Sequence, residues 1–387
     1  MVLAHELHHA EYRDWCEHCV AGKGVTHPRA QTGLVGQADA ERVLLDAYKS
    51  GRMHHAWLLS GPRGIGKATL AYRMAKFALH YGLPELVPDG LEDLSVPADS
   101  PAARQVTSLG HPDLLVIRRP YDDKAKRLRA VIPVEEARRL QPFFGKSAGA
   151  GGWRVCIVDA ADELNTNAAN ALLKLLEEPP AKALFLIVSH QPGRLLPTIR
   201  SRCRKLTLKP LPSPAISSIL AQEEVSLSPE DAEIIADLAA GSAGEALRLS
   251  AGGGIALYRE LVALLAHLPE PDAPEMHKLA DAASRRGADQ TFETLTDLLL
   301  TFVQRLIATA SGKPPAIEAA PHEAEIYRRL ASPKGVPALD RWVEVWEKIA
   351  HSVARGEALN TDRKLVILTA FSLLEAVAAG RRGATRR

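Results

Sequence analysis

The first place where this sequence could do chemistry is a glycine-rich run that ends in a lysine. Residues 61–67 read GPRGIGK, which fits the phosphate-loop pattern Gly-x-x-x-x-Gly-Lys. Glycines at these positions would let the backbone turn its N–H groups toward phosphate oxygens, and the lysine would contact the β- and γ-phosphates of a nucleotide. The predicted nucleotide-binding residues of this stretch are Gly61, Gly64, Ile65, Gly66, Lys67, Ala68 and Thr69.

The residue after the lysine departs from this pattern. Ala68 stands where Ser or Thr normally supplies the hydroxyl that binds Mg²⁺. Thr69 does not replace it, because one step along a helix rotates the side chain by roughly 100°, to another face. The sequence therefore leaves the binding of Mg²⁺ open. The simplest alternative is a glycine turn between a strand and a helix that binds nothing.

A carboxylate follows a second apolar strand. Residues 154–158 (RVCIV) lead into Asp159, which could hold the Mg²⁺ shell of a bound nucleotide. Nucleotide-hydrolysing motors with such a loop place a glutamate directly after this aspartate to orient the attacking water. That position here is Ala160, while Asp162 and Glu163 lie on the turn beyond. Loss of a positioned base costs on the order of 10²- to 10⁴-fold in rate. We therefore expect a site that can bind ATP without hydrolysing it.

The elements that must position these residues follow the order strand, glycine loop and helix. Residues 56–60 (AWLLS) are predicted to form a buried strand, and residues 69–80 the helix after the loop. Further strands are expected over 114–118, 154–158 and 184–189, and further helices over 37–48, 134–144 and 167–177. Strands that alternate with helices predict a three-layer α/β domain with a parallel sheet. Residues 84–112 are predicted to be an insertion or long loop.

Beyond residue 210 the strand patterns give way to helical ones. Residues 228–250 indicate helices capped at Ser228 and broken at Gly241, and residues 255–379 show apolar residues at helical spacing. The predicted organisation is an extension over 1–30, a P-loop domain over 31–210, a small helical domain over 211–252, a second helical domain over 253–380 and a basic tail over 381–387.

The composition is that of an ordinary globular protein. Of 387 residues, 46% are hydrophobic and 24% are charged, and a net charge of +2 argues against a chain that coats nucleic acid. Four cysteines argue against a disulfide framework and for a reducing compartment. The N-terminus has no apolar signal segment, and no run reaches the roughly 18 apolar residues of a membrane span. We expect a cytoplasmic protein.

The first 30 residues are unusually rich in potential metal ligands. HELHH over residues 5–9 formally matches HExxH, the pattern of zinc hydrolases, but such a helix needs a surrounding core and a third ligand. Cys16 and Cys19 could form a small zinc knuckle with two histidines. The low apolar content favours a disordered extension instead. The potential ligands are His5, His8, His9, Cys16, His18, Cys19 and His27.

Three segments together resemble the clamp-loader branch of the AAA+ ATPases. They read HAWLLSGPRGIGKATLAYRMAKFAL, VDAADELNTNAANALLKLLEEPP and FLIVSHQPGRLLPTIRSRC. Within that branch the chain is similar to the δ′ family of bacterial DNA polymerase III subunits, over roughly residues 31–379. The resemblance implies an AAA+ P-loop domain, a small helical lid and an all-helical collar.

The same resemblance implies partners and a role in DNA replication. Members of this family are non-catalytic subunits of the DNA polymerase III holoenzyme, a nucleotidyltransferase, and share a five-membered ring with δ and γ/τ subunits. The ring opens the sliding clamp and places it on primed DNA. In the family the arginine of the Ser-Arg-Cys triplet, here Arg202, reaches into the nucleotide site of a neighbouring γ/τ subunit. Arg202 is therefore the expected catalytic residue, supplied in trans as an arginine finger.

The sequence departs from the family in places. Some δ′ proteins carry four zinc-binding cysteines before the second strand, but residues 80–113 contain no cysteine, so no zinc is expected there. Active relatives place an arginine at a GSxR turn, where this chain has Gly244. Arg248, four residues later, is expected to be a surface residue of the lid. The main alternative function is that of an autonomous AAA+ ATPase of γ/τ type, against which Ala68, Ala160 and Gly244 argue. A zinc-dependent hydrolase that uses the N-terminal histidines is the other.

Overall fold

The described chain packs into two units. The computed structural model describes residues 26–122, 124, 127–145, 152–223, 225, 227–332, 338–359 and 361–381. One unit extends to Glu223 and includes Gly241–Gly244, and the other comprises the remaining described residues. The domain boundaries expected near residues 210 and 252 stay predictions. Every potential metal ligand named in the N-terminal extension except His27 lies outside the described residues.

The first unit is built on a parallel sheet that has five strands within the described residues. Their spatial order is β2-β5-β6-β1-β7. The strands are β1 (Ala56–Ser60), β2 (Leu114–Arg118), β5 (Arg154–Asp159), β6 (Ala183–Ser189) and β7 (Arg204–Thr207). A short antiparallel pair, β3 (Tyr121–Asp122) and β4 (Arg127–Leu128), follows β2. Because the carboxyl ends of parallel strands meet at one edge of a sheet, the loops after β1, β5 and β6 come together there.

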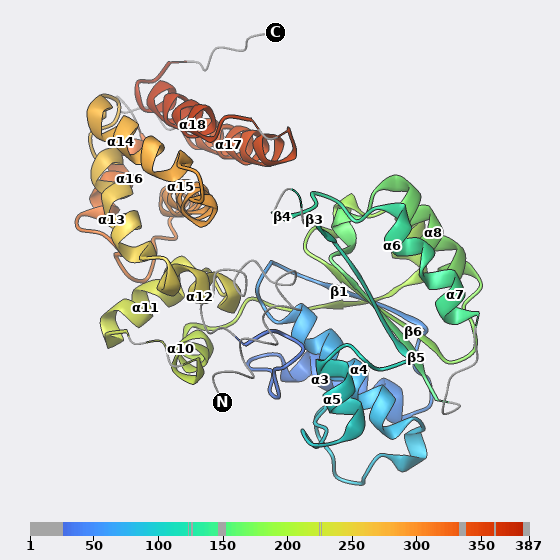
Figure 1. Ribbon diagram of the computed structural model, residues 1–387. Coiled ribbons are helices and arrows are strands. Elements are labelled where there is room, and N and C mark those ends of the chain that lie inside the picture. The colour runs from blue at the N-terminus through green and yellow to red at the C-terminus, as the bar shows by residue number, and fades with distance from the viewer. Residues whose placement is uncertain are drawn as a thin grey trace. The chain divides into compact units, whose positions relative to one another are not determined.

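Helices cover both faces of this sheet (Figure 1). One face carries α3 (Ala38–Lys49), α4 (Lys67–Tyr81) and α5 (Pro101–Thr107), with a turn of 3-10 helix at Pro84–Leu86. The other carries α6 (Val134–Arg138), α7 (Leu140–Phe144) and α8 (Thr166–Glu177). Two apolar cores therefore sandwich the sheet, and β1, β5 and β6 are buried along nearly their whole length. The predicted three-layer α/β domain with a parallel sheet is confirmed.

Two local predictions were wrong. Residues 84–112 are not all loop, because α5 forms there, with the Ser100 hydroxyl accepting the N–H of Ala103 and Pro101 in the first turn. The single helix predicted over 134–144 is two short helices. Pro142 has no N–H to donate to the carbonyl of Arg138, so the hydrogen-bond ladder is interrupted between them.

Apart from α10 (Ser213–Gln222) and the first two residues of α12 (Ala243–Ala251), which belong to the first unit, the helices after β7 make up the second. As predicted, Ser228 caps the first of them by accepting the N–H of Asp231. They are α11 (Pro229–Leu238), α12 (Ala243–Ala251), α13 (Gly254–Leu265), α14 (Ala273–Ser284), α15 (Asp289–Ala310), α16 (Glu323–Ala331), α17 (Leu339–Leu359) and α18 (Arg363–Ala378). The expected helical back half is confirmed. None of the described helices is long and apolar enough to cross a membrane.

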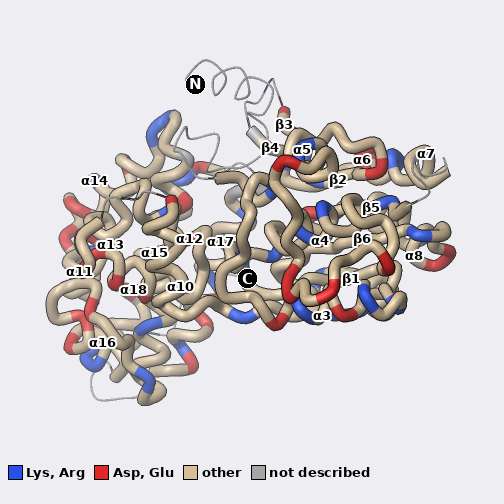
Figure 2. The backbone as a smooth tube through the Cα atoms, turned by 90° about the horizontal axis from the view of Figure 1, so that it is seen from below, with Lys and Arg blue, Asp and Glu red and all other residues tan. Residues whose placement is uncertain are grey.

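Charged residues of both signs are interspersed along both units (Figure 2). One of them corrects an expectation: Arg248 is only 6% exposed and is not a surface residue. Its guanidinium donates to the hydroxyl of Thr294 at 2.6 Å and to the carboxylates of Glu245 and Asp297 at 2.9 Å. Two of these partners come from α15, far along the chain, so the pattern of α12 alone could not reveal the burial.

Candidate phosphate-loop site

The loop after β1 has the backbone geometry that only glycine adopts easily. Gly61, Gly64 and Gly66 have φ angles of +139°, +74° and +99°. Gly66 is also the residue at which α4 begins, so the N-terminus of a 15-residue helix points toward the loop. Free N–H groups and the positive end of a helix at the same place form an anion-binding site. The predicted strand, glycine loop and helix are thus present.

Lys67 is held at this loop by the loop's own backbone. Its side chain is 3% exposed, and its ammonium donates to the carbonyl oxygen of Gly61 at 2.8 Å and to that of Pro62. Burial lowers the pKa of Lys67 to about 8, although Asp159 and Asp162 act in the opposite direction. The lysine therefore carries a positive charge at neutral pH and loses it under mildly alkaline conditions.

Asp159 lies at the carboxyl end of β5, beside the end of β2. Its partner in the strand register is Arg118. Burial raises the pKa of Asp159, and the nearby charges of Lys67, Arg118 and Arg63 counteract that rise. The predicted carboxylate and the predicted lysine are thus brought to the same edge of the sheet. Ala68, in the first turn of α4, contributes no side-chain oxygen to it.

The two carboxylates beyond Asp159 are already engaged. Asp162 accepts hydrogen bonds of 2.5 Å from the Ser189 hydroxyl and from the backbone N–H of His190, at the end of β6. Glu163 pairs with Arg119, with Oε2 and Nε 2.9 Å apart. Burial lowers the pKa of His190 to about 3, so its imidazole is neutral at physiological pH. Both acids thus already have partners within the first unit.

A turn distant in sequence lies against the phosphate loop. The N–H of Gly244 donates to the carbonyl oxygen of Gly64 at 3.0 Å, and the N–H of Leu211 donates to that of Gly241 at 2.8 Å. A Cβ added at Gly244 would lie 3.0 Å from the Cα of Gly64, closer than ordinary contact. The position where the family resemblance implies an arginine in active relatives is therefore filled by a contact between two backbones. Sequence reasoning did not foresee this contact.

Arg202 is the last residue of a short helix, α9 (Pro197–Arg202). Its Nη1 donates to the carbonyl oxygen of Thr198 at 3.0 Å, and its Nη2 lies 2.8 Å from Oε1 of Glu177. The side chain is 36% exposed. Arg200 has a buried Nε with no partner, and Arg204 stacks over the ring of Trp57, 4.8 Å from its centroid.

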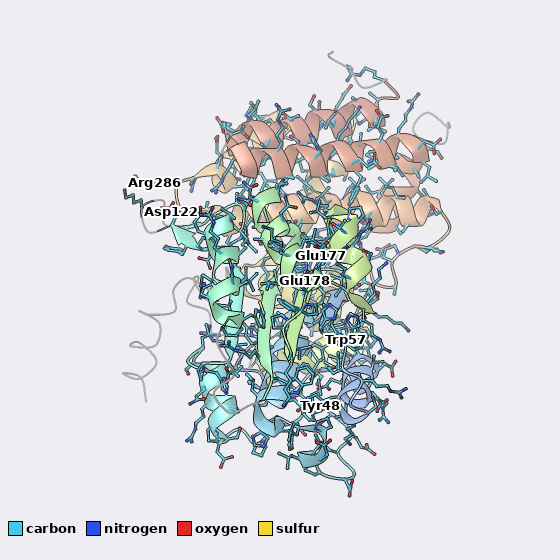
Figure 3. All side chains as sticks on the ribbon, turned by 90° about the vertical axis from the view of Figure 1, so that its right-hand side faces the viewer. Tyr48, Trp57, Asp122, Glu177, Glu178 and Arg286 are labelled. Atoms are coloured by element: carbon cyan, nitrogen blue, oxygen red, sulfur yellow. The ribbon has the colours of Figure 1, made fainter. Side chains whose placement is uncertain are left out.

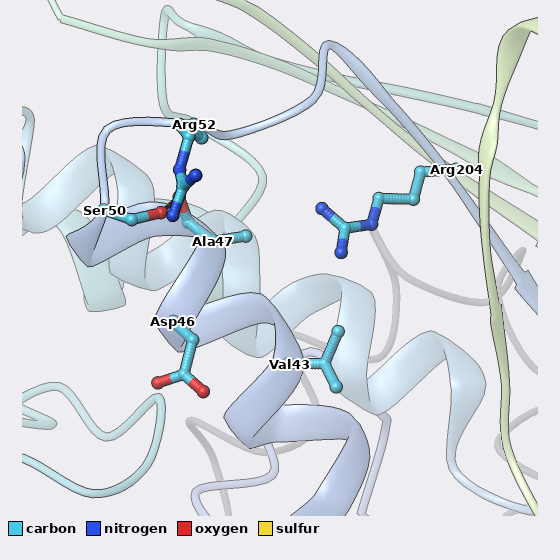
Figure 4. A pocket seen from close by; sticks show the side chains of 6 residues that line it. All are labelled: Val43, Asp46, Ala47, Ser50, Arg52 and Arg204. Carbon is cyan, nitrogen blue, oxygen red and sulfur yellow. Dashed lines mark hydrogen bonds between the residues drawn. The ribbon is translucent and has the colours of Figure 1, made fainter.

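Within the described residues, neither a metal-binding cluster nor the pocket beside α3 adds a second candidate site. No group of three His, Cys, Asp or Glu residues could hold a metal ion in that part. A shallow pocket of about 520 Å³ lies beside α3 and contains none of the phosphate-loop residues (Figure 4). Its lining residues are Val43, Asp46, Ala47, Ser50, Arg52 and Arg204.

Comparison with known proteins gives a consistent picture. A family model described as "DNA polymerase III, delta subunit" matches residues 36–212. The chain is 31% identical to DNA polymerase III subunit delta' of Escherichia coli over 263 residues, covering 68% of this chain and 73% of that protein. It is 37% identical to subunit delta' of Pseudomonas aeruginosa, covering 50% of this chain and 54% of that protein.

Relatives of another subunit match as well. Subunit tau of Salmonella typhimurium is 31% identical, over 75% of this chain and 45% of that protein. The matches thus span about half the length of several of these relatives. Among solved structures, a gamma subunit-related protein of Thermotoga maritima matches at 18% identity with a TM-score of 0.37, covering 87% of this chain and 99% of that one. From its sequence relatives, the chain belongs to the DNA polymerase III subunit delta' family.

Proposed function

We propose that this chain is a clamp-loader subunit of the replicative DNA polymerase III holoenzyme, an assembly component rather than a catalyst. The observation that carries the proposal is a phosphate loop that keeps its glycines and lysine but lacks the metal-binding hydroxyl, beside a strand end that lacks the water-orienting carboxylate. Lys67 and Asp159 are in place, but Ala68 and Ala160 stand where a metal ligand and a water-orienting base would be needed. Family membership supplies the context in which such a subunit works with others.

The partners follow from the family. A subunit of this kind would join δ and γ/τ subunits in a ring that opens the sliding clamp and places it on primed DNA. The near-neutral charge of this chain agrees with DNA contacts that are shared across a ring. Several of its relatives are themselves γ/τ subunits, so a chain of this kind shares its ancestry with the ATPases that it would assist.

ATP fits the residues present better than Mg²⁺ does. Gly61, Gly64, Gly66 and Lys67 would hold the phosphates through backbone N–H groups and one ammonium. Mg²⁺ prefers oxygen ligands, and two of the three carboxylates at the end of β5 and the turn after it, Asp162 and Glu163, already have partners. The chain would therefore bind the nucleotide and leave hydrolysis to a neighbour.

The contribution to that neighbour would be Arg202. Transfer of the γ-phosphoryl group builds charge on its equatorial oxygens, and a guanidinium supplied in trans is worth roughly 10³ to 10⁵ in rate. A guanidinium stays charged and has a planar fork that grips two oxygens. Arg202 exposes 36% of its side chain, and Arg204 is exposed as well, although it stacks on Trp57, so the Ser-Arg-Cys match rather than exposure points to Arg202.

An autonomous ATPase of γ/τ type is the second candidate, favoured by the similarity to τ over three quarters of this chain. A steady-state ATPase assay on the isolated protein separates the two. The zinc-hydrolase alternative rests on residues outside the described part and is tested by metal analysis of the purified chain.

The proposal is tested by co-assembly. The purified chain is mixed with δ and γ/τ subunits from the same organism, and the mass of the product is measured by size-exclusion chromatography with light scattering. A single complex that contains this chain and loads clamps onto primed DNA is expected. A chain that elutes alone under conditions in which the other subunits associate would exclude the proposal.

A further inference from the structure

The end of α8 holds the guanidinium of Arg202 in a defined place. Nη2 lies 2.8 Å from Oε1 of Glu177, the last residue of α8, and Nη1 donates to the carbonyl oxygen of Thr198 one turn earlier in α9. The two terminal nitrogens of one planar group are therefore fixed from different elements. The side chain still exposes 36% of its surface, which leaves room for a second anionic partner.

The C-terminal end of α8 favours a bound cation for a second reason. The helix has 12 residues and ends at Glu177, before Glu178, Pro179 and Pro180. Its last carbonyl groups point toward the C-terminal end and place a partial negative charge there. Prolines after the helix prevent its continuation, so Glu177 stays at the terminus. The helix dipole and the carboxylate of Glu177 act on Arg202 in the same direction.

We propose that Glu177 is a positioning residue for the arginine finger: it orients the Arg202 guanidinium toward the nucleotide of a neighbouring subunit. The inference rests on the proposed function of Arg202 in trans. Glu177 is 43% exposed, and ion pairs this accessible contribute little to the stability of a fold. The ion pair between Glu177 and Arg202 therefore acts by fixing the position of the guanidinium. Transition-state stabilisation depends steeply on that position.

Glu178 is the matched control. It is the neighbouring carboxylate at the same helix end, as the labels in Figure 3 show, and no ion pair joins it to another described residue. Glu178→Gln and Glu177→Gln remove the same charge one residue apart. If charge at this surface had a general effect, both variants would lower the ATPase rate alike. If the effect acts through Arg202, only Glu177→Gln would lower the rate.

The test is a double-mutant cycle in the reconstituted ring with γ/τ and δ, measured as kcat and KM for ATP in the presence of primed DNA. The variants are Glu177→Gln, Arg202→Ala and the two combined, with Glu178→Gln as control. We expect Glu177→Gln to lower kcat by no more than Arg202→Ala does, with KM unchanged, and to add nothing to Arg202→Ala, because both substitutions act at one of several active sites in the ring. Glu177→Asp, which keeps the charge, should restore part of kcat.

The outcomes are distinguishable. If Arg202→Ala leaves kcat at the wild-type value, the proposed function of Arg202 fails and the inference fails with it. If Arg202→Ala lowers kcat but Glu177→Gln does not, or if the two losses multiply, Arg202 acts in trans without Glu177 and the inference alone is overturned. Assembly and the melting temperature of each variant are checked first, because a misfolded variant would lose activity without regard to the cycle.

Discussion

The backbone N–H of Gly244 donates a 3.0 Å hydrogen bond to the carbonyl oxygen of Gly64 and so ties the first turn of α12 to the phosphate loop. Neither glycine has room for a side chain: a Cβ at Gly64 would lie 2.2 Å from the Ser242 hydroxyl oxygen, and one at Gly244 would lie 3.0 Å from the Gly64 Cα. An arginine at position 244, which the family resemblance implies for active ATPases, would have to push this turn away from the loop.

Gly64→Ala should therefore destabilise the first unit. Alanine at a φ of +74° is strained, and its Cβ would overlap Ser242, so we expect a loss of about 1 to 3 kcal/mol in the free energy of unfolding. Urea denaturation measures it. Gly193→Ala is the control, because an added Cβ meets no atom within 4 Å there. In the Gly64→Ala variant, a second substitution, Ser242→Ala, should recover part of the lost stability. Equal stability of the Gly64→Ala and Gly193→Ala variants would contradict the close packing of Gly64 against Ser242.

Nucleotide binding should depend on Lys67 and on pH. The pKa of Lys67 is lowered by burial to about 8, so its charge is present below that pH and is lost above it. The affinity for ATP should fall as the pH rises from 7 to 9, and Lys67→Ala should remove both the binding and its pH dependence. Titration with a fluorescent nucleotide measures this. Turnover of ATP by the isolated chain at roughly 1 s⁻¹, ordinary for an enzyme, would refute the interpretation of Ala68 and Ala160.

Glu323 should be the acid-sensitive residue of the second unit. This fully buried carboxylate accepts hydrogen bonds from Arg305 at 3.0 Å, from the Ala319 N–H at 2.8 Å and from the hydroxyls of Tyr258 and Tyr327 at 2.5 Å. Although burial raises its pKa, these donors outweigh burial and hold the pKa below the ordinary value of 4.5. Its contribution to stability is therefore complete above that pH and is lost as the pH falls through the lowered pKa.

Glu323→Gln should cost about 1.5 to 3 kcal/mol at pH 7, because buried Arg305 would lose one of its two carboxylate partners and keep only Asp237. The difference in unfolding free energy between wild type and variant should shrink as the pH falls below about 4. Chemical denaturation at pH 7, 5 and 3 measures both effects. Glu325→Gln, a substitution of an exposed carboxylate on the same helix, is the control. A pH-independent difference would mean that the carboxylate charge of Glu323 contributes nothing.

The sequence could predict the elements that are determined by local residue patterns. Four of the five sheet strands, the phosphate loop and α8 have strong apolar runs, glycines or caps, and the structure places them within one or two residues of the prediction. β7 was missed because only Leu206 of its four residues is buried, so no apolar run marks it. The family resemblance, rather than any periodicity, pointed to Arg202.

Contacts between distant segments could not be predicted in the same way. Nothing in GSAGEALR shows that Gly244 meets Gly64, or that Arg248 finds Thr294 and Asp297 on another helix. The pairing of Glu177 with Arg202 joins residues 25 positions apart, which share no motif spacing. In each case the partner is set by how helices pack, and packing depends on the whole sequence.

Arg202→Ala in the reconstituted ring tests the central claim most directly. The substitution removes a partly exposed side chain, so folding and ring assembly should be unchanged, while DNA-stimulated ATP hydrolysis should fall in part and clamp loading should fall more, since one of several active sites loses its guanidinium. Arg200→Ala, two residues earlier on α9, is the control and should match the wild type in both rates. Equal ATPase and clamp-loading rates for Arg202→Ala and wild type, in rings of equal mass, would contradict the claim that this chain supplies Arg202 to a neighbour.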